Sequence, residues 1–117
     1  METYVVEIVG DVLILRADGG INTSTASQLS DSIGKLVKGG ITNIIVDCTK
    51  LSIISSMGLG ALLMLHTRMK RVGGEIRLAA LSGAVVQVIK MTKLDRVFEI
   101  YPDVEQARLS FRKPSKS

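Results

Sequence analysis

The sequence predicts a single α/β domain with a mixed β-sheet, opened by a β-hairpin and carrying helices mainly on one face. Its 117 residues suit one domain, and apolar residues make up 46% of them, which is ordinary for a packed core. Segments rich in Val, Ile and Leu alternate with segments of helical periodicity, which favours a largely parallel sheet. The expected order is β-β-α-β-α-β-α-β-α.

The hairpin is expected at the start of the chain. Residues 4–9 and 12–17 are rich in Val, Ile and Leu, and a Gly-Asp pair at 10–11 separates them. Gly in the first position suits a tight turn with positive φ there. The Asp-Gly-Gly sequence at 18–20 is expected to end the second strand. Glu7 interrupts the first strand, which favours a place towards the sheet edge.

A first amphipathic helix is expected to follow. Asn22, Thr23 and Ser24 each have a side-chain oxygen that suits an N-cap,. A Gly pair at 39–40 ends the helical pattern. Its apolar positions are Ala26, Leu29, Ile33, Leu36 and Val37.

Residues 43–47, Asn-Ile-Ile-Val-Asp, form an apolar run without alternation. Such a run is typical of a central parallel strand that is buried on both faces. Residues 50–54 lead into a second helix, which is expected to begin near Ser56, run to about Val72 and stop at a Gly pair at 73–74. The buried stripe of this helix is expected to comprise Ala61, Leu62, Leu65, Met69 and Val72,.

The rest of the chain repeats the alternation. Strands are expected at 75–80 and 97–100, and a helix capped by Ser82 is expected to run to about Met91. Asp103 is expected to cap the final helix. One face of that helix is apolar: Val104, Ala107 and Phe111.

Positive charge is concentrated at the end of the chain. Lys and Arg number 15 against 11 Asp and Glu, a formal net charge of +4, and Arg112, Lys113 and Lys116 lie in the last six residues. We expect a folded domain over residues 1–111 and a basic, disordered tail over 112–117. Aromatic residues make up only 3% and no basic stripe follows a helix, so direct nucleic-acid binding is not expected.

The sequence contains little catalytic machinery. His66 lies ten positions after Ser56 on the same expected helix, about 15 Å along its axis, so the two cannot form a hydrolytic pair. Cys48 is the only cysteine, which excludes a disulfide or a cysteine metal site within one chain. Asp18 and Asp47 are interpreted as a turn residue and a strand-end cap rather than as active-site acids. We expect no catalytic residue, no metal and no cofactor.

The sequence also lacks membrane and export signals. Its longest unbroken run of apolar residues and glycine is 57–65, far short of the ~20 residues that a membrane span needs. Its first residues do not combine a basic segment with a long apolar run, as a signal peptide would. We therefore expect a cytoplasmic protein without a membrane span.

One segment could carry a function, the Ser-Ser-Met-Gly-Leu-Gly sequence at 55–60. Its small residues would let another backbone or a ligand approach closely. Hydroxyl groups at a helix N-terminus lie where free N–H groups and the helix dipole stabilise an anion, including a phosphate on the serine itself. The other interpretation is a plain N-cap, with glycines that permit tight packing of helix on sheet.

Three local patterns resemble the STAS family, the anti-sigma factor antagonists. They are Gly-Gly-Ile-Asn-Thr-Ser-Thr-Ala at 19–26, Ile-Ile-Val-Asp at 44–47 with Leu-Ser-Ile-Ile-Ser-Ser-Met-Gly-Leu-Gly at 51–60, and Gly-Gly-Glu-Ile-Arg-Leu-Ala at 73–79. The resemblance covers about residues 4–111 and implies a binding protein, not an enzyme. It implies a partner that is an anti-sigma factor or serine kinase of the histidine-kinase-like ATPase type. Such a partner can phosphorylate a serine at the start of the second helix.

The chain departs from the usual family pattern, Asp-Ser-Ser/Thr-Gly-Leu-Gly, in which the second hydroxyl residue accepts the phosphate. Met57 stands at that acceptor position, Ser55 at the position of the acid, and Asn22 where the first-helix loop often has an acid. A family branch with Ser-Ser-Ala-Gly-Leu is closer to this chain. The resemblance therefore implies Ser56 as the first phosphorylation candidate and Ser55 as the second.

Met57 and Met64 lie seven positions apart, nearly two helical turns, and outside the expected buried stripe. We expect them to be partly exposed at a partner-binding face, although both could instead pack under a neighbouring loop. A monomer or weak dimer is expected. The second hypothesis is a STAS scaffold or ligand-sensing module that binds another protein without phosphorylation. The predicted partner-binding residues are Asn22, Thr23, Ser55, Ser56, Met57, Gly58 and Met64.

Overall fold

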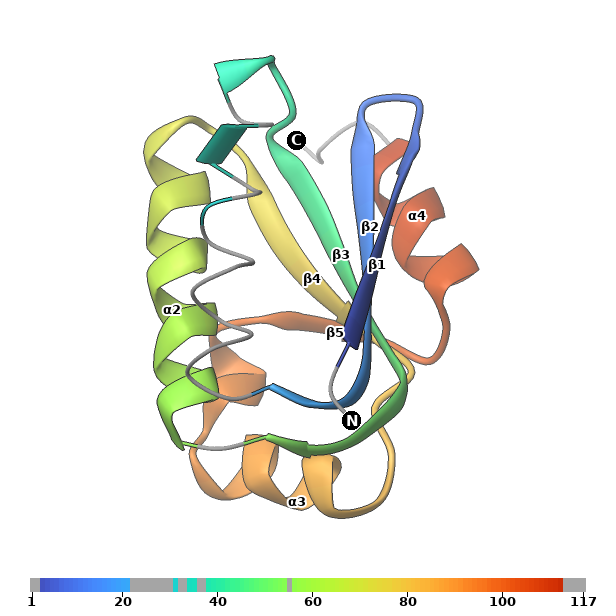
Figure 1. The fold of residues 1–117 in the computed structure, drawn as a ribbon, viewed down its shortest axis with the longest axis vertical. Helices are drawn as coiled ribbons and strands as arrows, with labels where there is room; N and C mark the ends of the chain where they lie inside the picture. Colours follow the sequence, from blue (N-terminus) through green and yellow to red (C-terminus); the bar gives the residue numbers. More distant parts are fainter. Residues whose placement is uncertain (1–2, 22–30, 32–33, 36–37, 55, 113–117) are drawn as a thin grey trace.

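The computed structural model of this chain describes residues 3–21, 31, 34–35, 38–54 and 56–112. These residues form a five-stranded sheet in the order β1-β2-β3-β4-β5 (Figure 1). β1 and β2 pair antiparallel, and each later pair is parallel, so the predicted mixed sheet is confirmed. The strands are β1 (Thr3–Val9), β2 (Val12–Ile21), β3 (Asn43–Ile54), β4 (Glu75–Ala79) and β5 (Glu99–Tyr101).

The opening hairpin closes in two residues, as predicted. Val9 pairs with Val12, which leaves Gly10 and Asp11 in the turn. Gly10 has a φ of 65°, a left-handed conformation that glycine adopts without strain. The first strand, β1, lies at the edge of the sheet, which was also predicted.

The central strand is β3, which pairs with β2 on one side and β4 on the other. Ile44, Ile45 and Val46 are all buried, which confirms the prediction for residues 43–47. Ile44 and Val46 belong to the core on one face, and Ile45 belongs to the core on the other. Because successive side chains of a strand point to opposite faces, a strand covered on both sides has no polar alternation.

Both β2 and β3 are longer than the sequence predicts. The Asp-Gly-Gly sequence at 18–20 does not end β2, which continues to Ile21, and β3 continues to Ile54. The two extensions pair with each other, with two register shifts between residues 16 and 20. Glycine within a strand can mark a bulge as well as a turn, and here it marks bulges.

Helices cover both faces of the sheet (Figure 1). α2 (Ser56–Arg71) and α3 (Gly83–Met91) pack on one face, and α4 (Val104–Arg112) packs on the other. A short 3₁₀ helix, η1 (Leu94–Arg96), follows α3. The larger core receives from α2 and α3 the side chains of Leu62, Leu65, Met69, Val85 and Ile89. The smaller core consists of Val12, Ile45, Ala79 and Ala107.

Two predictions at the ends of elements were wrong: the burial of Val72 and the first residue of the last strand. Val72 is 47% exposed instead of completing the buried stripe, because α2 ends at Arg71 and Val72 begins the turn. The last strand begins at Glu99 rather than Val97, because η1 and the turn after it occupy the preceding residues.

The two predicted helix caps differ in their chemistry. The Oδ1 atom of Asp103 accepts a 2.8 Å hydrogen bond from the backbone N–H of Gln106, so the cap of α4 is confirmed. Ser82 occupies the N-cap position of α3, but its side chain makes no capping hydrogen bond. Ala107 is fully buried, as predicted for the apolar face of α4.

Two predicted segments lie wholly or mostly outside the described residues. One is the first helix, whose apolar positions were placed at 26, 29, 33, 36 and 37. The other is the tail at 112–117, of which only Arg112 is described, as the last residue of α4.

Candidate functional site

The candidate site lies at the carboxyl end of the central strand. β3 ends at Ile54 and α2 begins at Ser56, the residue near which the sequence predicts the second helix to begin. Ligands of open α/β sheets bind beyond the carboxyl ends of parallel strands. Figure 1 shows the start of α2 at this end of the sheet, with α3 nearby.

Packing fixes the backbone on both sides of Ser56. Leu51 and Ile54 are 5% and 6% exposed at the end of β3. Gly58 and Leu59 are buried in the first turn of α2. The start of the helix is therefore held by apolar contacts that the sequence places before and after the serine.

A hydrogen bond joins the two bulged strand ends next to this site. The Ser52 hydroxyl on β3 donates to the backbone carbonyl of Gly19 on β2, at 2.6 Å. Gly19 lies in the Gly-Gly-Ile sequence on which part of the family resemblance rests. The extended pairing of β2 with β3 thus brings this sequence beside the segment that leads into α2.

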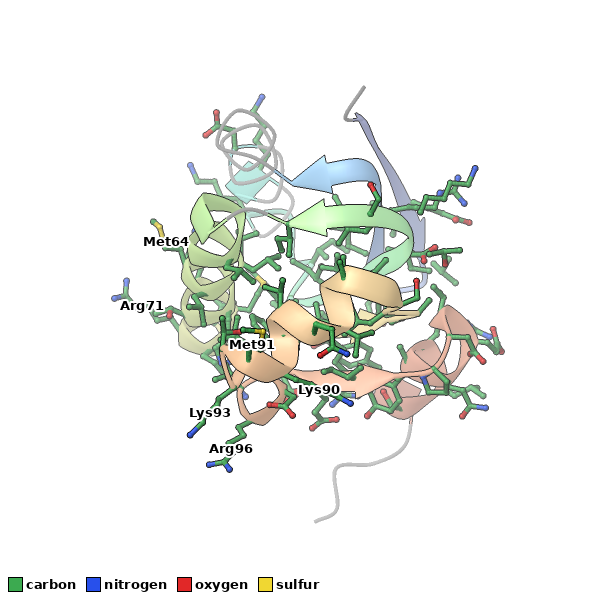
Figure 2. The ribbon with its side chains drawn as sticks, turned by 90° about the horizontal axis from the view of Figure 1, so that it is seen from below. Met64, Arg71, Lys90, Met91, Lys93 and Arg96 are labelled. Carbon is green, nitrogen blue, oxygen red and sulfur yellow. The ribbon has the colours of Figure 1, made fainter. Side chains whose placement is uncertain are left out.

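Met64 is 69% exposed, as predicted. It lies eight residues after Ser56 on α2, about 12 Å along the helix axis. Figure 2 shows Met64 and Arg71 projecting outward from the same side of α2. Leu62 and Leu65 are each 3% exposed, so the buried stripe of α2 faces the sheet and leaves Met64 outside it.

The remaining predicted site residues are only partly described. Ser56 and Met57 are the first two residues of α2, but their side chains lie outside what the structure describes. The role of the whole set in partner binding stays a prediction. Three of the predicted residues lie outside the described part of the chain: Asn22, Thr23 and Ser55.

The charge distribution of α2 favours an anion at its start. Its first turn has no acidic residue, and its last turn has Arg68, Lys70 and Arg71. Cations near a helix C-terminus offset the negative end of the helix dipole. At the N-terminus no carboxylate of the first turn offsets the positive end of the helix dipole, which stabilises negative charge,.

Asp47 was interpreted as a strand-end cap, but it lies within β3, which continues to Ile54. Its side chain is 8% exposed, and its Oδ1 atom accepts hydrogen bonds from the backbone N–H of Thr49 at 3.0 Å and from the Thr49 hydroxyl at 2.5 Å. These bonds satisfy the carboxylate within its own strand. Asp18 was interpreted as a turn residue, but its backbone lies within β2 and pairs with Lys50 of β3; its side chain lies outside what the structure describes.

The single histidine packs against the core. The rings of His66 and Phe98 meet edge to face, with centroids 5.2 Å apart. Its Nδ1 atom is buried and has no hydrogen-bond partner among the described residues. This placement agrees with the interpretation of His66 as a helix-face residue.

Cys48 is buried in the larger core. Burial, with a smaller contribution from the charge of Asp47, raises the pKa of its thiol to about 12. The thiol is therefore neutral and a poor nucleophile at ordinary pH.

The described residues form neither a metal-ion site nor a membrane-spanning helix. They contain no group of three His, Cys, Asp or Glu side chains placed to hold a metal ion. None of their helices has the length and apolar character needed to cross a membrane.

A group of exposed basic residues around the end of α3 was not predicted from the sequence. Lys90, Lys93 and Arg96 are exposed, and Met91 beside them is 79% exposed. The signal in the sequence was the segment Lys-Met-Thr-Lys-Leu-Asp-Arg at 90–96. It places three cations within seven residues, but periodicity shows neither the end of α3 nor the 3₁₀ helix that follows.

Comparison with known proteins finds relatives over nearly the whole chain. The Bordetella bronchiseptica protein named "Putative anti-sigma factor antagonist BtrV" is 28% identical over 101 residues, covering 86% of this chain and 87% of BtrV. The crystal structure of an anti-sigma factor antagonist from Mycobacterium paratuberculosis is similar with a TM-score of 0.84 and 26% identity, covering 97% of this chain and 96% of that one.

A third relative shares the fold. The anti-sigma factor antagonist SpoIIAA of Bacillus, in its unphosphorylated form, has a TM-score of 0.83 and 23% identity, covering 94% of this chain and 96% of that one. SpoIIAA has also been solved in its phosphorylated form. The family model described as "STAS domain" matches residues 3–107, from β1 into α4. The chain therefore belongs to the STAS domain family.

Proposed function

We propose that this chain is an anti-sigma factor antagonist, which acts by binding an anti-sigma factor and catalyses no reaction of its own. The observation that carries the proposal is the position of Ser56, the first residue of α2 at the carboxyl end of the central strand. The names of BtrV and of the mycobacterial protein support the class of function. The partner is an anti-sigma factor of the histidine-kinase-like ATPase type.

Phosphorylation of Ser56 would control this binding, with Ser55 as the second candidate acceptor. A phosphate adds a charge of about −1.5 to −2. The start of α2 would stabilise that charge because its first turn has no acidic residue,. The same charge would have to lose its hydration when a partner covers the site, so phosphorylation should weaken binding.

The binding face would extend along α2 to Met64. This side chain is 69% exposed, and methionine is flexible and polarizable, which suits an adaptable contact. Substitution Met64→Glu should weaken partner binding at least tenfold while the melting temperature hardly changes. Leu109→Glu is the matched control, because Leu109 is 38% exposed on α4, which packs on the other face of the sheet. A melting temperature that falls in step with affinity would place Met64 in the core instead.

The decisive experiment uses a histidine-kinase-like ATPase from the same genome, preferably one that is encoded beside this gene. The full chain is incubated with that ATPase, Mg²⁺ and ATP, and its intact mass is measured. We expect one phosphate on the wild type and on Ser55→Ala, and none on Ser56→Ala. Ser56→Asp should bind the ATPase at least tenfold more weakly than the wild type, and Ser56→Ala should bind equally well.

A second function is favoured by one observation. Met57 stands where the usual family pattern has the phosphoacceptor, and a thioether cannot accept phosphate. The chain would then be a STAS scaffold that binds its partner without a phosphate switch. An unmodified mass together with equal binding by Ser56→Asp would favour this scaffold. An ATPase that binds no form of the chain would contradict the antagonist function.

A further inference from the structure

The end of α3 and η1 combine positive charge with exposed apolar side chains. Lys90, Lys93 and Arg96 are exposed, and none forms an ion pair with a residue that the structure describes. Met91 and Val97 are 79% and 41% exposed. Figure 2 shows Lys93 and Arg96 projecting towards one edge of the molecule, with Lys90 nearer the middle of the view. These five residues are called the α3–η1 surface.

Local structure explains only part of this surface. Lys90 lies in the last turn of α3, where a cation offsets the helix dipole. Lys93 is the N-cap residue of η1 and Arg96 is its last residue, and Figure 2 shows the two side chains projecting towards the same edge. Neither the dipole nor the capping of α3 requires Arg96, or an almost fully exposed Met91 beside the charges.

An apolar groove of about 230 Å³ adjoins one of these cations, Lys90. Ile89, Ile100 and Tyr101 contribute apolar walls, and Lys90 and Asp95 also line it. Ile100 is 38% exposed although it belongs to a strand, because β5 is an edge strand of the sheet. The groove could hold about seven water molecules at liquid density, or one large apolar side chain.

We propose that the α3–η1 surface binds an acidic segment of a partner protein, with one apolar side chain of that segment in the groove. Three cations against the single carboxylate of Asp95 leave a net positive surface, which attracts and orients an acidic chain. Its carboxylates would meet Lys93 and Arg96. Met91 would add a contact that adapts to the partner. The proposal does not rest on the proposed function, since it uses different residues.

An anionic membrane is the other surface with matching charge. Recognition of acidic lipids by this route uses clusters of about four to eight basic residues, whereas the α3–η1 surface has three and Asp95 lies among them. The groove also favours a chain over a bilayer, because a separate side chain can enter a recess. The observations therefore favour a protein segment.

The test begins with selection of random dodecapeptides, displayed on phage, against the immobilised full chain. We expect the selected peptides to contain an apolar residue flanked by Asp or Glu. The strongest synthetic peptide is then titrated into ¹⁵N-labelled chain, where shifted amides should concentrate in residues 89–101. Its dissociation constant, from fluorescence anisotropy, should rise at least tenfold for the double variant Lys93→Glu/Arg96→Glu.

The matched control is Lys35→Glu/Lys38→Glu, which makes the same charge change at the same spacing on exposed residues. It should change the dissociation constant by less than twofold. If the first double variant melts early, Lys93→Asn/Arg96→Gln replaces it, because Asn tolerates the left-handed φ of 61° at residue 93,.

Four outcomes would overturn the proposal. They are a selection without binders, selected peptides without excess Asp or Glu, equal weakening of peptide binding by both double variants, and tight binding to phosphatidylglycerol vesicles in place of peptides.

Phosphorylation by the proposed partner of α2 provides an independent check. Charge reversal at 93 and 96 should leave phosphorylation of Ser56 unchanged, so failure of either proposal would be seen separately.

Discussion

Neighbouring side chains on β3 face different layers of the molecule. Cys48 packs in the larger core with α2 and α3, whereas Ile45 packs under α4. Burial also changes the titration of the Cys48 thiol. Its thiol has a pKa raised by burial to about 12, against an ordinary value of 9.0.

The free energy of unfolding should therefore fall at alkaline pH. The unfolded chain ionises Cys48 from pH 9 upwards, whereas the folded chain keeps it neutral until about 12. The contribution of Cys48 to the free energy of unfolding is thus complete below pH 9. It is lost as the pH rises from 9 to about 12, with a loss of about 1.4 kcal/mol at pH 10. Urea unfolding at pH 8 and pH 10 measures it.

The control for this titration is Cys48→Ala, which should be less stable at both pH values but lack this loss. A thiol reagent gives a second reading. Native Cys48 should react at pH 8 only as fast as the chain unfolds. Rapid reaction in the native state would contradict the burial of the thiol.

Among single residues, Arg77 shows what the sequence could not predict. A charged residue within a strand normally indicates a solvent-facing position, yet the Arg77 side chain is only 13% exposed. Its guanidinium carbon lies 4.0 Å from the centre of the Phe111 ring. Its burial depends on Phe111 of α4, which lies 34 residues further along the chain, and no local pattern connects the two.

At the scale of elements, Gly74 allows the turn after α2 to pack closely against the residues before β3. The backbone N–H of Glu75 donates to the carbonyl of Thr42 at 3.1 Å, so the residues before β3 and β4 approach closely. A Cβ atom added at Gly74 would lie 1.8 Å from that carbonyl oxygen. In contrast, a Cβ atom at Gly60 on α2 would meet nothing within 4 Å.

The substitution Gly74→Ala should lower the free energy of unfolding by about 3 kcal/mol, because backbone must move to admit the methyl group. Its control is Gly60→Ala, which should raise stability by about 0.5–1 kcal/mol, since glycine is a poor residue within a helix. Denaturant unfolding measures both. Equal effects of the two substitutions would contradict the close approach at Gly74.

The types of the described elements could largely be predicted, whereas several of their ends could not. Apolar runs without alternation identified the centre of the sheet, and helical spacing identified α2 and α3. The extensions of β2 and β3 contain glycine, Asp18, Thr49, Lys50 and Ser52, a composition typical of loops. Pairing between the two chain segments makes these residues strands, and that pairing is not a local property.

The same distinction applies to the candidate site. Ser56 was identified at the start of α2 from the small residues that follow it, and the structure places the helix start there. Exposure of Met64 followed from helical periodicity. The α3–η1 surface was not predicted, because it depends on where α3 stops and on the 3₁₀ turn after it.

At the scale of the whole molecule, Arg77 joins α4 to the sheet. Arg77 forms ion pairs with Glu75 at 3.0 Å and Glu99 at 3.7 Å, and it donates a hydrogen bond to the Ser110 hydroxyl on α4. Burial acts to raise the pKa of Glu75, but Arg77, helped by Lys70, outweighs burial and lowers it from 4.5. The attachment of α4 therefore contains an acid-sensitive contact.

Substitution Arg77→Met should destabilise the chain by about 1–3 kcal/mol, because it leaves the Oε1 atom of the partly buried Glu75 carboxylate without its hydrogen-bond partner,. In the wild type, the stability from Glu75 is present above its ordinary pKa of 4.5 and is lost as pH falls through the lowered value. Arg77→Met should show a smaller loss. Thermal melts between pH 7 and pH 3 measure both effects.

The matched control for Arg77→Met is Arg108→Met. Arg108 pairs at 2.6 Å with Glu105, whose side chain is 62% exposed, so its loss should change stability by less than about 1 kcal/mol. If both variants melt alike, the contacts of Arg77 with α4 do not hold this layer in place.

The strand order of the sheet is also the order of the strands along the chain. Each strand after β1 therefore finds its first partner already synthesised when it emerges from the ribosome. The hairpin of β1 and β2 serves as the template for β3, and each later strand extends the same growing edge. α4 is the last described helix along the chain and reaches back to cover Val12 and Ile45, so the smaller core is completed after the larger one during translation.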